Sequence, residues 1–193
     1  GTQDNWTWSR PSLEHGKSYM VRVRARDRAV SFNERTQDFS FTYDAVMPTA
    51  TITAPGHNTS TNVALVISGT GIEDGTGIST ISVSIDQSGN GGADCYNPGA
   101  TAFNAVCPNF FATGGTLANW TVTGVNWTPG YQYVIVSSVT DIAGNTNNLF
   151  VAGNSSVTFT YDTAAPTLGI SDPPAAEDRS SSLEPLLGTA NDT

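Results

Sequence analysis

Carboxylates are the most abundant side chains of this sequence that could do chemistry. The 193 residues include 17 Asp and Glu, but only eight Lys and Arg and two His, and the formal net charge is −9. Carboxylates serve either as general acids and bases or as ligands of hard cations such as Ca²⁺, which takes about six to eight oxygen ligands. Catalysis needs a partner group at a defined spacing, whereas a cation site needs several oxygens that meet in space.

The spacing of these groups does not indicate catalysis. The sequence contains no HExxH, no G-x-S-x-G and no glycine-rich phosphate loop that opens a helix. His15 and His57 lie in turn-like contexts, and the acids are scattered over loops rather than paired on strands as in glycoside hydrolases. We therefore predict that the chain is not an enzyme. Its acidic balance argues against nucleic acid as a partner, and no apolar run is long enough to predict membrane insertion.

Two groups of oxygen-bearing side chains are candidates for a Ca²⁺ site. The first group comes from a linker, a TGIEDGTG loop and a TDIAGNTNN loop, and consists of Asp44, Glu73, Asp74, Asp141 and Asn145. The second group lies nearer the C-terminus and consists of Asp162 and Asp192, with Asn191 beside them. The alternative is that Asp141 and Asn145 only close a turn through side-chain hydrogen bonds, and that Asp44 and Asp162 only end strands.

Short β-strands are the elements that would position these residues. Thr, Ser, Val, Gly and Asn are frequent, and apolar residues alternate with polar ones between Gly, Asn and Pro clusters. The pattern predicts about seven strands, typical of an antiparallel β-sandwich of immunoglobulin type, in which the entering chain and two loops share one pole. The first group could therefore converge there. The predicted strands are 49–53, 63–68, 78–86, 101–103 with 109–112, 119–123, 131–139 and 156–161.

The sequence also repeats itself. FTYDAVMPTATI at 41–52 recurs as FTYDTAAPTLGI at 159–170, and the NWT of residues 5–7 recurs at 119–121. We interpret the recurring segment as the last strand of one unit, an acid, and an entry into the next unit that proline restricts. The chain then divides into the C-terminal part of one unit (1–44), a complete unit (45–162) and the N-terminal part of a third (163–193).

The order of these motifs resembles the tandem bacterial immunoglobulin-like repeats of surface proteins and adhesins. The matching residues are G-x-x-Y-x-V-x-V at 16–23, D-x-A-G-N at 141–145 and the recurring F-T-Y-D…P-T. The first unit departs from this pattern, because DRAVSFN replaces D-x-A-G-N, so we expect its turn to be built differently. The resemblance implies an all-β fold of tandem sandwiches, one complete and two partial, and a spacer, stalk or adhesive role.

Cys95 and Cys107 bracket a turn-rich insert, CYNPGATAFNAVC. Their spacing matches no zinc pattern, so we predict a local disulfide rather than half of a metal site. A disulfide implies an oxidising compartment, which favours an extracellular or cell-surface location.

Tryptophans and arginines each leave two interpretations open. Trp6, Trp8 and Trp120 are predicted to be core residues, whereas Trp127 in the loop NWTPG belongs either to the core or to a sugar-binding surface. The alternating arginines of YMVRVRAR form either a basic stripe for an anionic polysaccharide or a solvated face that neighbouring acids balance; these are Arg22, Arg24 and Arg26.

We therefore predict a non-catalytic structural or adhesive segment of an extracellular bacterial surface protein, a stalk or spacer that Ca²⁺ could stiffen. Its partners would be the neighbouring repeats of the same protein and a glycan or protein of a host or surface. Two alternatives remain: a carbohydrate-binding module that uses the cysteine loop and Trp127, and an accessory spacer of a secreted hydrolase.

Overall fold

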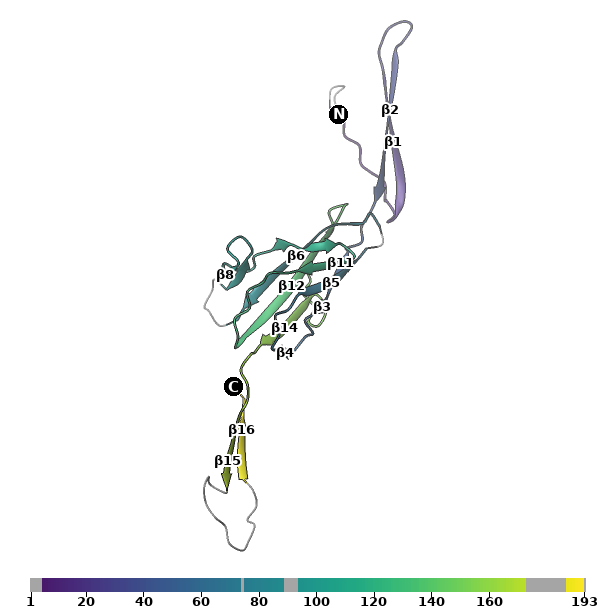
Figure 1. The fold of residues 1–193 in the computed structure, drawn as a ribbon. Coiled ribbons are helices and arrows are strands. Elements are labelled where there is room, and N and C mark those ends of the chain that lie inside the picture. The colour runs from purple at the N-terminus through teal and green to yellow at the C-terminus, as the bar shows by residue number, and fades with distance from the viewer. Residues whose placement is uncertain (1–4, 74, 89–93, 173–186, 193) are drawn as a thin grey trace, which may run out of the picture.

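The computed structural model describes residues 5–73, 75–88, 94–172 and 187–192. Within these ranges it contains strands and no helix, and almost all strand pairs are antiparallel. Figure 1 shows three successive parts along the chain, namely an N-terminal hairpin, a central body and a C-terminal hairpin. The N-terminal hairpin pairs β1 (Lys17–Arg26) with β2 (Glu34–Tyr43), and the C-terminal hairpin pairs β15 (Thr167–Asp172) with β16 (Leu187–Asn191).

The body consists of two sheets. The four-stranded sheet has the order β10 (Gly114–Thr116), β11 (Asn119–Val122), β5 (Ile67–Ile72) and β3 (Thr49–Ala54). The larger sheet has the order β4 (Thr59–Thr61), β14 (Ser156–Tyr161), β12 (Tyr131–Asp141), β6 (Ile78–Gln87), β7 (Cys95–Asn97) and β8 (Ala102–Ala105). Two short strands extend it: β13 (Thr146–Asn147) pairs with β12, and β9 (Phe111–Ala112) pairs with β6.

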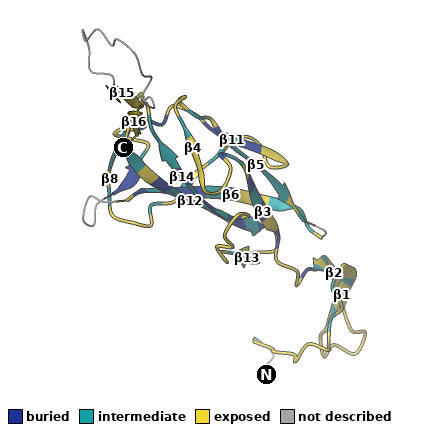
Figure 2. Cartoon of the chain, turned by 90° about the horizontal axis from the view of Figure 1, so that it is seen from below, coloured by how far each residue is buried: buried dark blue, intermediate teal, exposed yellow. Residues whose placement is uncertain are grey.

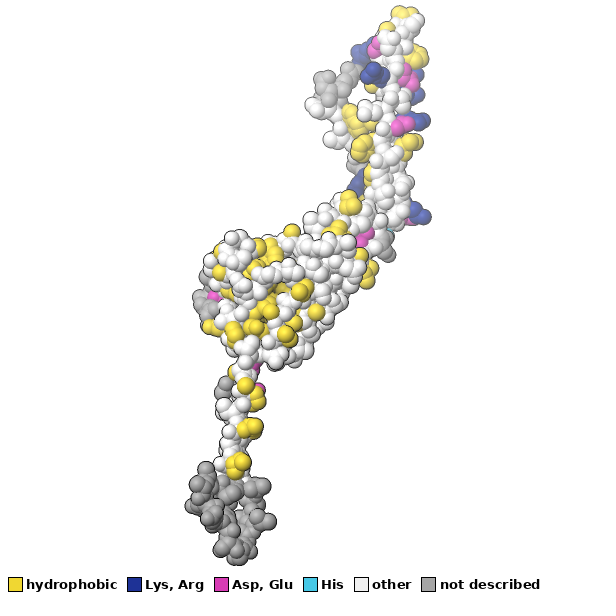
Figure 3. Space-filling view, in the orientation of Figure 1, with side chains coloured by type: hydrophobic (Ala, Val, Ile, Leu, Met, Phe, Trp, Pro, Cys, Tyr) yellow, Lys and Arg dark blue, Asp and Glu magenta, His cyan; other side chains and the backbone are white. Residues whose placement is uncertain are grey.

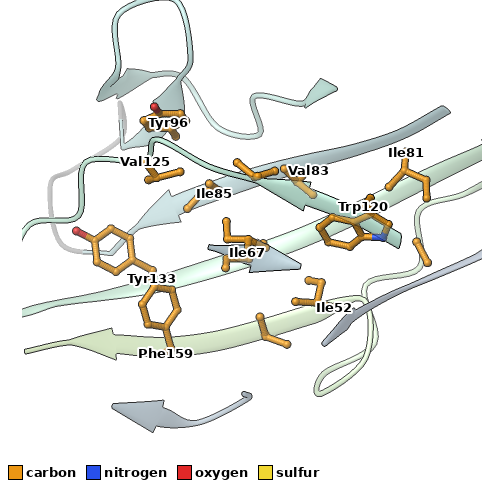
Figure 4. Close-up of a cluster of buried hydrophobic side chains, with 14 of the residues drawn as sticks. Ile52, Ile67, Ile81, Val83, Ile85, Tyr96, Trp120, Val125, Tyr133 and Phe159 are labelled. Atoms are coloured by element: carbon orange, nitrogen blue, oxygen red, sulfur yellow. The ribbon is translucent and has the colours of Figure 1, made fainter. Parts of the chain in front are cut away.

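One cluster of buried side chains contains residues of both sheets. Figure 4 shows Ile67 and Trp120 of the smaller sheet with Ile85, Tyr133 and Phe159 of the larger one. Alternation along β12 places every second residue from Tyr133 to Asp141 in the interior, as a strand with one buried face requires. Figure 2 shows that buried residues are concentrated in the body, so the body holds the hydrophobic core.

The second predicted strand of the body does not lie where its pattern places it. The expected range 63–68 is wrong for most of its length, because β5 spans Ile67–Ile72 and includes Gly69 and Gly71. Gly69 pairs with Trp120, and a Cβ at Gly69 would collide with the indole ring and with the backbone oxygen of Thr51. Glycine is needed here because a ring from another strand packs on the backbone, and not because the chain turns.

The N-terminal hairpin repeats the pairing of β12 with β14. Tyr19 is opposite Phe41 in the hairpin, and Tyr133 is opposite Phe159 in the body. The aromatic rings of both pairs are stacked, with centroids 5.8 Å and 5.3 Å apart. The hydroxyl oxygens of the two tyrosines accept backbone N–H groups at equivalent positions, from Glu14 at 2.8 Å and from Thr128 at 2.7 Å.

The C-terminal hairpin repeats the pairing of β3 with β5. Ile170 is opposite Gly188, as Ile52 is opposite Gly69. Both ladders shift register immediately after the isoleucine, before Asp172 in one and before Ala54 in the other. The sequence repeat is therefore also a repeat of strand pairing.

The arginines of β1 lie on an exposed strand face beside acids. Arg22 donates two hydrogen bonds to Asp38, at 2.7 and 2.8 Å, and Arg26 donates to Glu34 at 3.1 Å. Arg24 lies 3.9 Å from the same Glu34. These contacts favour a solvated strand face whose arginines are balanced by neighbouring acids over a basic stripe that binds an anionic polysaccharide.

Cys95 and Cys107 form a disulfide whose Cα atoms are 5.1 Å apart. A carboxylate oxygen of Asp86 lies near both sulfur atoms, but bonded sulfurs do not ligate a metal. The bond indicates an oxidising environment. None of the described residues lies in a helix that could span a membrane.

Candidate cation site at the first junction

Three carboxylates meet where the N-terminal hairpin joins the body. Asp44 directly follows β2, Glu73 directly follows β5, and Asp141 is the last residue of β12. The loops that follow β5 and β12 are tied together, because the backbone N–H of Ile142 donates to the carbonyl oxygen of Gly77 at 2.9 Å. Strand ends thus bring together residues that lie far apart in the sequence.

One oxygen from each of these carboxylates lies within 4.8 Å of the other two. Asp44 and Asp141 are buried, with 7 % and 2 % of their surface exposed, and Glu73 is partly buried. Negative charges this close repel one another, and the repulsion is stronger in a partly buried site than in water. The cluster therefore favours a bound cation.

Asp44 is held by donors of the loop that follows β5 and of the linker that follows Asp44 itself. Its Oδ2 accepts the backbone N–H and the hydroxyl of Thr76, both at 2.8 Å, and its Oδ1 accepts the N–H of Val46 at 3.1 Å. His15 Nδ1 lies 3.2 Å from Oδ1. These donors, first the Thr76 amide and then the Val46 amide, hold the pKa of Asp44 below its ordinary 3.8. Asp44 is therefore ionised at neutral pH.

Asp141 and Asn145 close the turn after β12 and also contact the linker. The backbone N–H and the side-chain amide of Asn145 donate to the two oxygens of Asp141, each at 2.8 Å. The same amide lies 3.3 Å from the backbone oxygen of Asp44, to which it also donates. Asp141 and Asn145 therefore do close the turn, and they also lie at the junction beside Asp44.

The N-terminal hairpin closes its turn with the same residue pair. Asn33 donates to Asp27 through its backbone N–H at 2.9 Å and its side-chain amide at 2.6 Å. The expectation that DRAVSFN builds its turn differently is therefore correct only for the loop length. An aspartate and a later asparagine bond to each other in both loops.

Glu73 supplies an oxygen that the protein leaves unpaired. Its Oε2 accepts the N–H of Gly77 at 2.5 Å, whereas its Oε1 is buried and has no hydrogen-bond partner among the described residues. A buried acceptor without a partner costs on the order of 1–3 kcal/mol, and more if it is charged. An ion coordinated by Oε1 would remove that cost.

Gly75 keeps the space beside the carboxylates open. A Cβ at this position would collide with the carboxylate of Asp44 and would lie 2.9 Å from Glu73 Oε1. Three carboxylates, an unpaired oxygen and a glycine that makes room for them fit a hard cation that prefers oxygen ligands, as Ca²⁺ does.

The other predicted ligands are placed differently. Asp74 lies outside the described residues. Asp162 accepts the N–H of Ala164 at 2.8 Å, which repeats the turn of Asp44 with Val46. Asp192 follows β16 as Glu73 follows β5. Within the described part of the chain neither Asp162 nor Asp192 belongs to a group of three possible metal ligands.

Trp127 is a core residue. It is 9 % exposed, its ring meets those of Tyr133 and Phe159 edge-on, and its Nε1–H donates to the backbone oxygen of Leu65 at 3.3 Å. Its ring faces are therefore not available to stack on a sugar, contrary to its candidate role as a ligand-binding residue.

Sequence reasoning missed several residues of the site. Thr76, Gly75 and Gly77 surround the carboxylates, and His15 reaches them from the hairpin. The signal for the first three was the DGTG run that follows Glu73, because glycines beside acids allow backbone amides to approach carboxylates closely. Nothing near His15 in the sequence indicates its position.

Acid should destabilise the junction through Asp44. Because its pKa is lower in the folded chain than in the unfolded chain, its contribution is complete above about pH 4 and is lost as the pH falls through the folded pKa. Thermal melts between pH 6 and pH 2.5 should show a steeper fall of the midpoint for the native chain than for Asp44→Asn. If the midpoint falls equally steeply with pH in both proteins, the ionised Asp44 does not stabilise the junction.

Comparison with protein-family models, with curated proteins and with solved structures finds no match for this chain. Functional inference therefore depends on the geometry of the chain itself.

Proposed function

We propose that this chain is a non-catalytic structural segment of an extracellular bacterial surface protein, in which immunoglobulin-like β-sandwiches follow one another as a stalk or spacer and Ca²⁺ at the junctions stiffens it. The observation that carries the proposal is the carboxylate cluster of Asp44, Glu73 and Asp141. The cluster connects Asp44, which directly follows the N-terminal hairpin, to Glu73 and Asp141, which lie at the ends of β5 and β12 in the body.

The strand arrangement of the body supports an immunoglobulin-like sandwich. The first strand is split, with β3 pairing in the smaller sheet and β4 running parallel to β14 in the larger one. The hydroxyl of Tyr133 bonds both the N–H and the carbonyl oxygen of Thr128, at 2.7 and 3.0 Å. Such a tyrosine corner near the start of a long strand is typical of this fold.

The terminal hairpins support the tandem organisation. The N-terminal hairpin reproduces the register of β12 with β14. The C-terminal hairpin reproduces the register of β3 with β5, including the register shift after the isoleucine. Residues 1–44, 45–162 and 163–193 then belong to three consecutive units. The neighbouring repeats are the main partners of each unit.

A stalk is favoured over a carbohydrate-binding module. The aromatic contact expected for such a module is Trp127, and that side chain is instead packed in the core. The disulfide supports an extracellular location, because such bonds persist in oxidising compartments. An adhesive role toward a glycan or protein would require a further surface.

Limited digestion with chymotrypsin tests the unit boundaries and the cation together. At low protein concentration, cleavage should begin in the hairpins and leave a fragment of about 45–162, because exposed strands open more easily than a packed core. Ca²⁺ should slow the cut after Tyr43, where Asp44 joins the cluster. It should not slow the cut after Tyr161, where Asp162 has the same turn without the cluster. Equal protection at both sites, or hairpins as resistant as the body, would contradict the proposal.

A further inference from the structure

We propose that the body bears tension along the chain, and that β3, β4 and β14 form the clamp that resists it. The proposal rests on the proposed stalk function and adds a load-bearing role, which a stiff junction does not supply by itself. In a stalk, neighbouring units pull on the body through the residue that enters it, Asp44, and the residue that leaves it, Asp162.

The two points of attachment lie at opposite ends of the body. Asp44 meets the end of β12, whereas Asp162 follows the end of β14, which runs antiparallel to β12. Figure 1 shows the two hairpins at opposite ends of the body, and Figure 3 shows a narrow neck of chain at each end. Tension therefore pulls the first strand of the body toward one end and β14 toward the other.

The pairing of β4 with β14 opposes this sliding. The two strands are parallel, and their register runs from Thr59 opposite Phe159 to Thr61 opposite Tyr161. The load reaches β4 at its start and β14 at its end, so the strands are pulled past each other along their length. All bonds of such a ladder are loaded together and must break together, whereas bonds at one open end break singly.

Further hydrogen bonds extend the ladder beyond both ends of β4. The backbone N–H of Asn58 donates to the carbonyl oxygen of Thr158 at 2.7 Å, and that of Asp162 donates to Thr61 at 2.9 Å. The imidazole Nδ1 of His57 accepts the N–H of Thr158 at 3.1 Å, in place of a backbone oxygen. The loaded contact is therefore longer than the three paired residues of β4.

The loop between β12 and β14 holds the start of the first strand. The side-chain amide of Asn147 donates to the backbone oxygen of Pro48 at 3.0 Å, and the backbone N–H of Ile52 donates to the oxygen of Asn154 at 2.9 Å. The entering segment is thus bonded to β5 and also to this loop. Tension must break both sets of bonds before β3 leaves the body.

The two hairpins of the same chain are loaded in the other way. Lys17 is opposite Tyr43 in the N-terminal hairpin, and Thr167 is opposite Asn191 in the C-terminal one. Both strands of each hairpin are therefore pulled from the same end, and their pairs open one after another. The hairpins serve as an internal reference for weak resistance.

Stretching single molecules tests the clamp. The native chain is held at its two ends in chelator, and the force is raised steadily. The hairpins should open first, and the body should unfold last, at a force at least about twice as high. The disulfide identifies the body, because it keeps Cys95 and Cys107 together although they are 12 positions apart. In reductant the extension released by the body should therefore increase by roughly 40 Å.

Matched variants separate the clamp from overall stability. Asn147→Asp keeps the oxygen that accepts the N–H of Leu149 but replaces the donor to Pro48 by an oxygen that repels its carbonyl. At a fixed force the body should unfold about tenfold faster. Asn148→Asp adds the same charge at an exposed neighbour, and Ile85→Val removes one buried methyl group from β6, outside the clamp. Both controls should stay within about twofold of the native rate. Equal acceleration by Asn147→Asp and Ile85→Val would overturn the proposal.

Ca²⁺ distinguishes the clamp from the proposed junction site. The cluster connects Asp44, which precedes β3, to Glu73 and Asp141, so a bound ion should raise the force at which the body unfolds. If the body unfolds at the force of the hairpins, the clamp is wrong, and a thermal midpoint that still rises with Ca²⁺ leaves the junction site in place. If the body outlasts the hairpins but Ca²⁺ changes neither the force nor the midpoint, the clamp stands and the junction does not bind the ion.

Discussion

Ca²⁺ should raise the thermal midpoint of the native chain by about 10 °C, and Glu73→Gln should abolish that rise. A ligand at about 100 times its dissociation constant adds about 2.7 kcal/mol to the free energy of unfolding, and each kcal/mol shifts the midpoint of a domain of this size by roughly 4 °C. Glu73 is the informative position because its Oε1 is buried and unpaired. Differential scanning calorimetry in chelator and in millimolar Ca²⁺ measures both values.

In chelator, where no metal is bound, Glu73→Gln should not lower the thermal midpoint. Glu73→Gln removes one of three negative charges that lie within 4.8 Å of one another, so the midpoint in chelator should stay the same or rise. Asp162→Asn is the matched control, because Asp162 makes the turn of Asp44 but belongs to no cluster among the described residues. Its Ca²⁺ response should equal that of the native chain. If Ca²⁺ shifts the thermal midpoint of neither the native chain nor any variant, the junction does not bind Ca²⁺.

Trp120→Ala should cost about 3–5 kcal/mol of the free energy of unfolding of the body, as expected for a large side chain removed from a core. Trp120 is fully buried and lies over Gly69, so its loss leaves a cavity that the neighbouring strands cannot fill. Trp6→Ala is the control at the equivalent position of the repeat, and it should change the free energy by less than about 0.5 kcal/mol, because Trp6 is 60 % exposed. Urea denaturation followed by circular dichroism measures both.

A third variant distinguishes the shape of the indole from its polar group. The Nε1–H of Trp120 is buried without a partner among the described residues. Trp120→Phe removes this unpaired donor together with part of the ring, and the two effects oppose each other. We expect a loss well below that of Trp120→Ala. Equal losses for the two variants would show that the full indole is required, and a small loss for Trp120→Ala would contradict the central role of this side chain in the core.

Local sequence determined most of the long strands, the turn after β12 and the repeat. Alternating apolar residues from Tyr131 onward suffice to predict β12, because a strand with one buried face has a period of two. The aspartate–asparagine pair of Asp141 and Asn145 predicts its turn, because those side chains bond backbone groups a few residues away. The recurrence of FTYD predicts the joints. These features depend on neighbours in the chain, so a single sequence contains them.

Only the tertiary structure decided which distant residues meet. Gly69 indicates a turn by its local context, but it lies within a strand because Trp120 packs on it from β11. Trp127 has an open loop context and is nevertheless buried against Tyr133. Asp44, Glu73 and Asp141 form a cluster, with one oxygen of Glu73 left unpaired, because three strands end at the same junction. Burial and electrostatic repulsion depend on these partners, and the partners become neighbours only when the sheets pack.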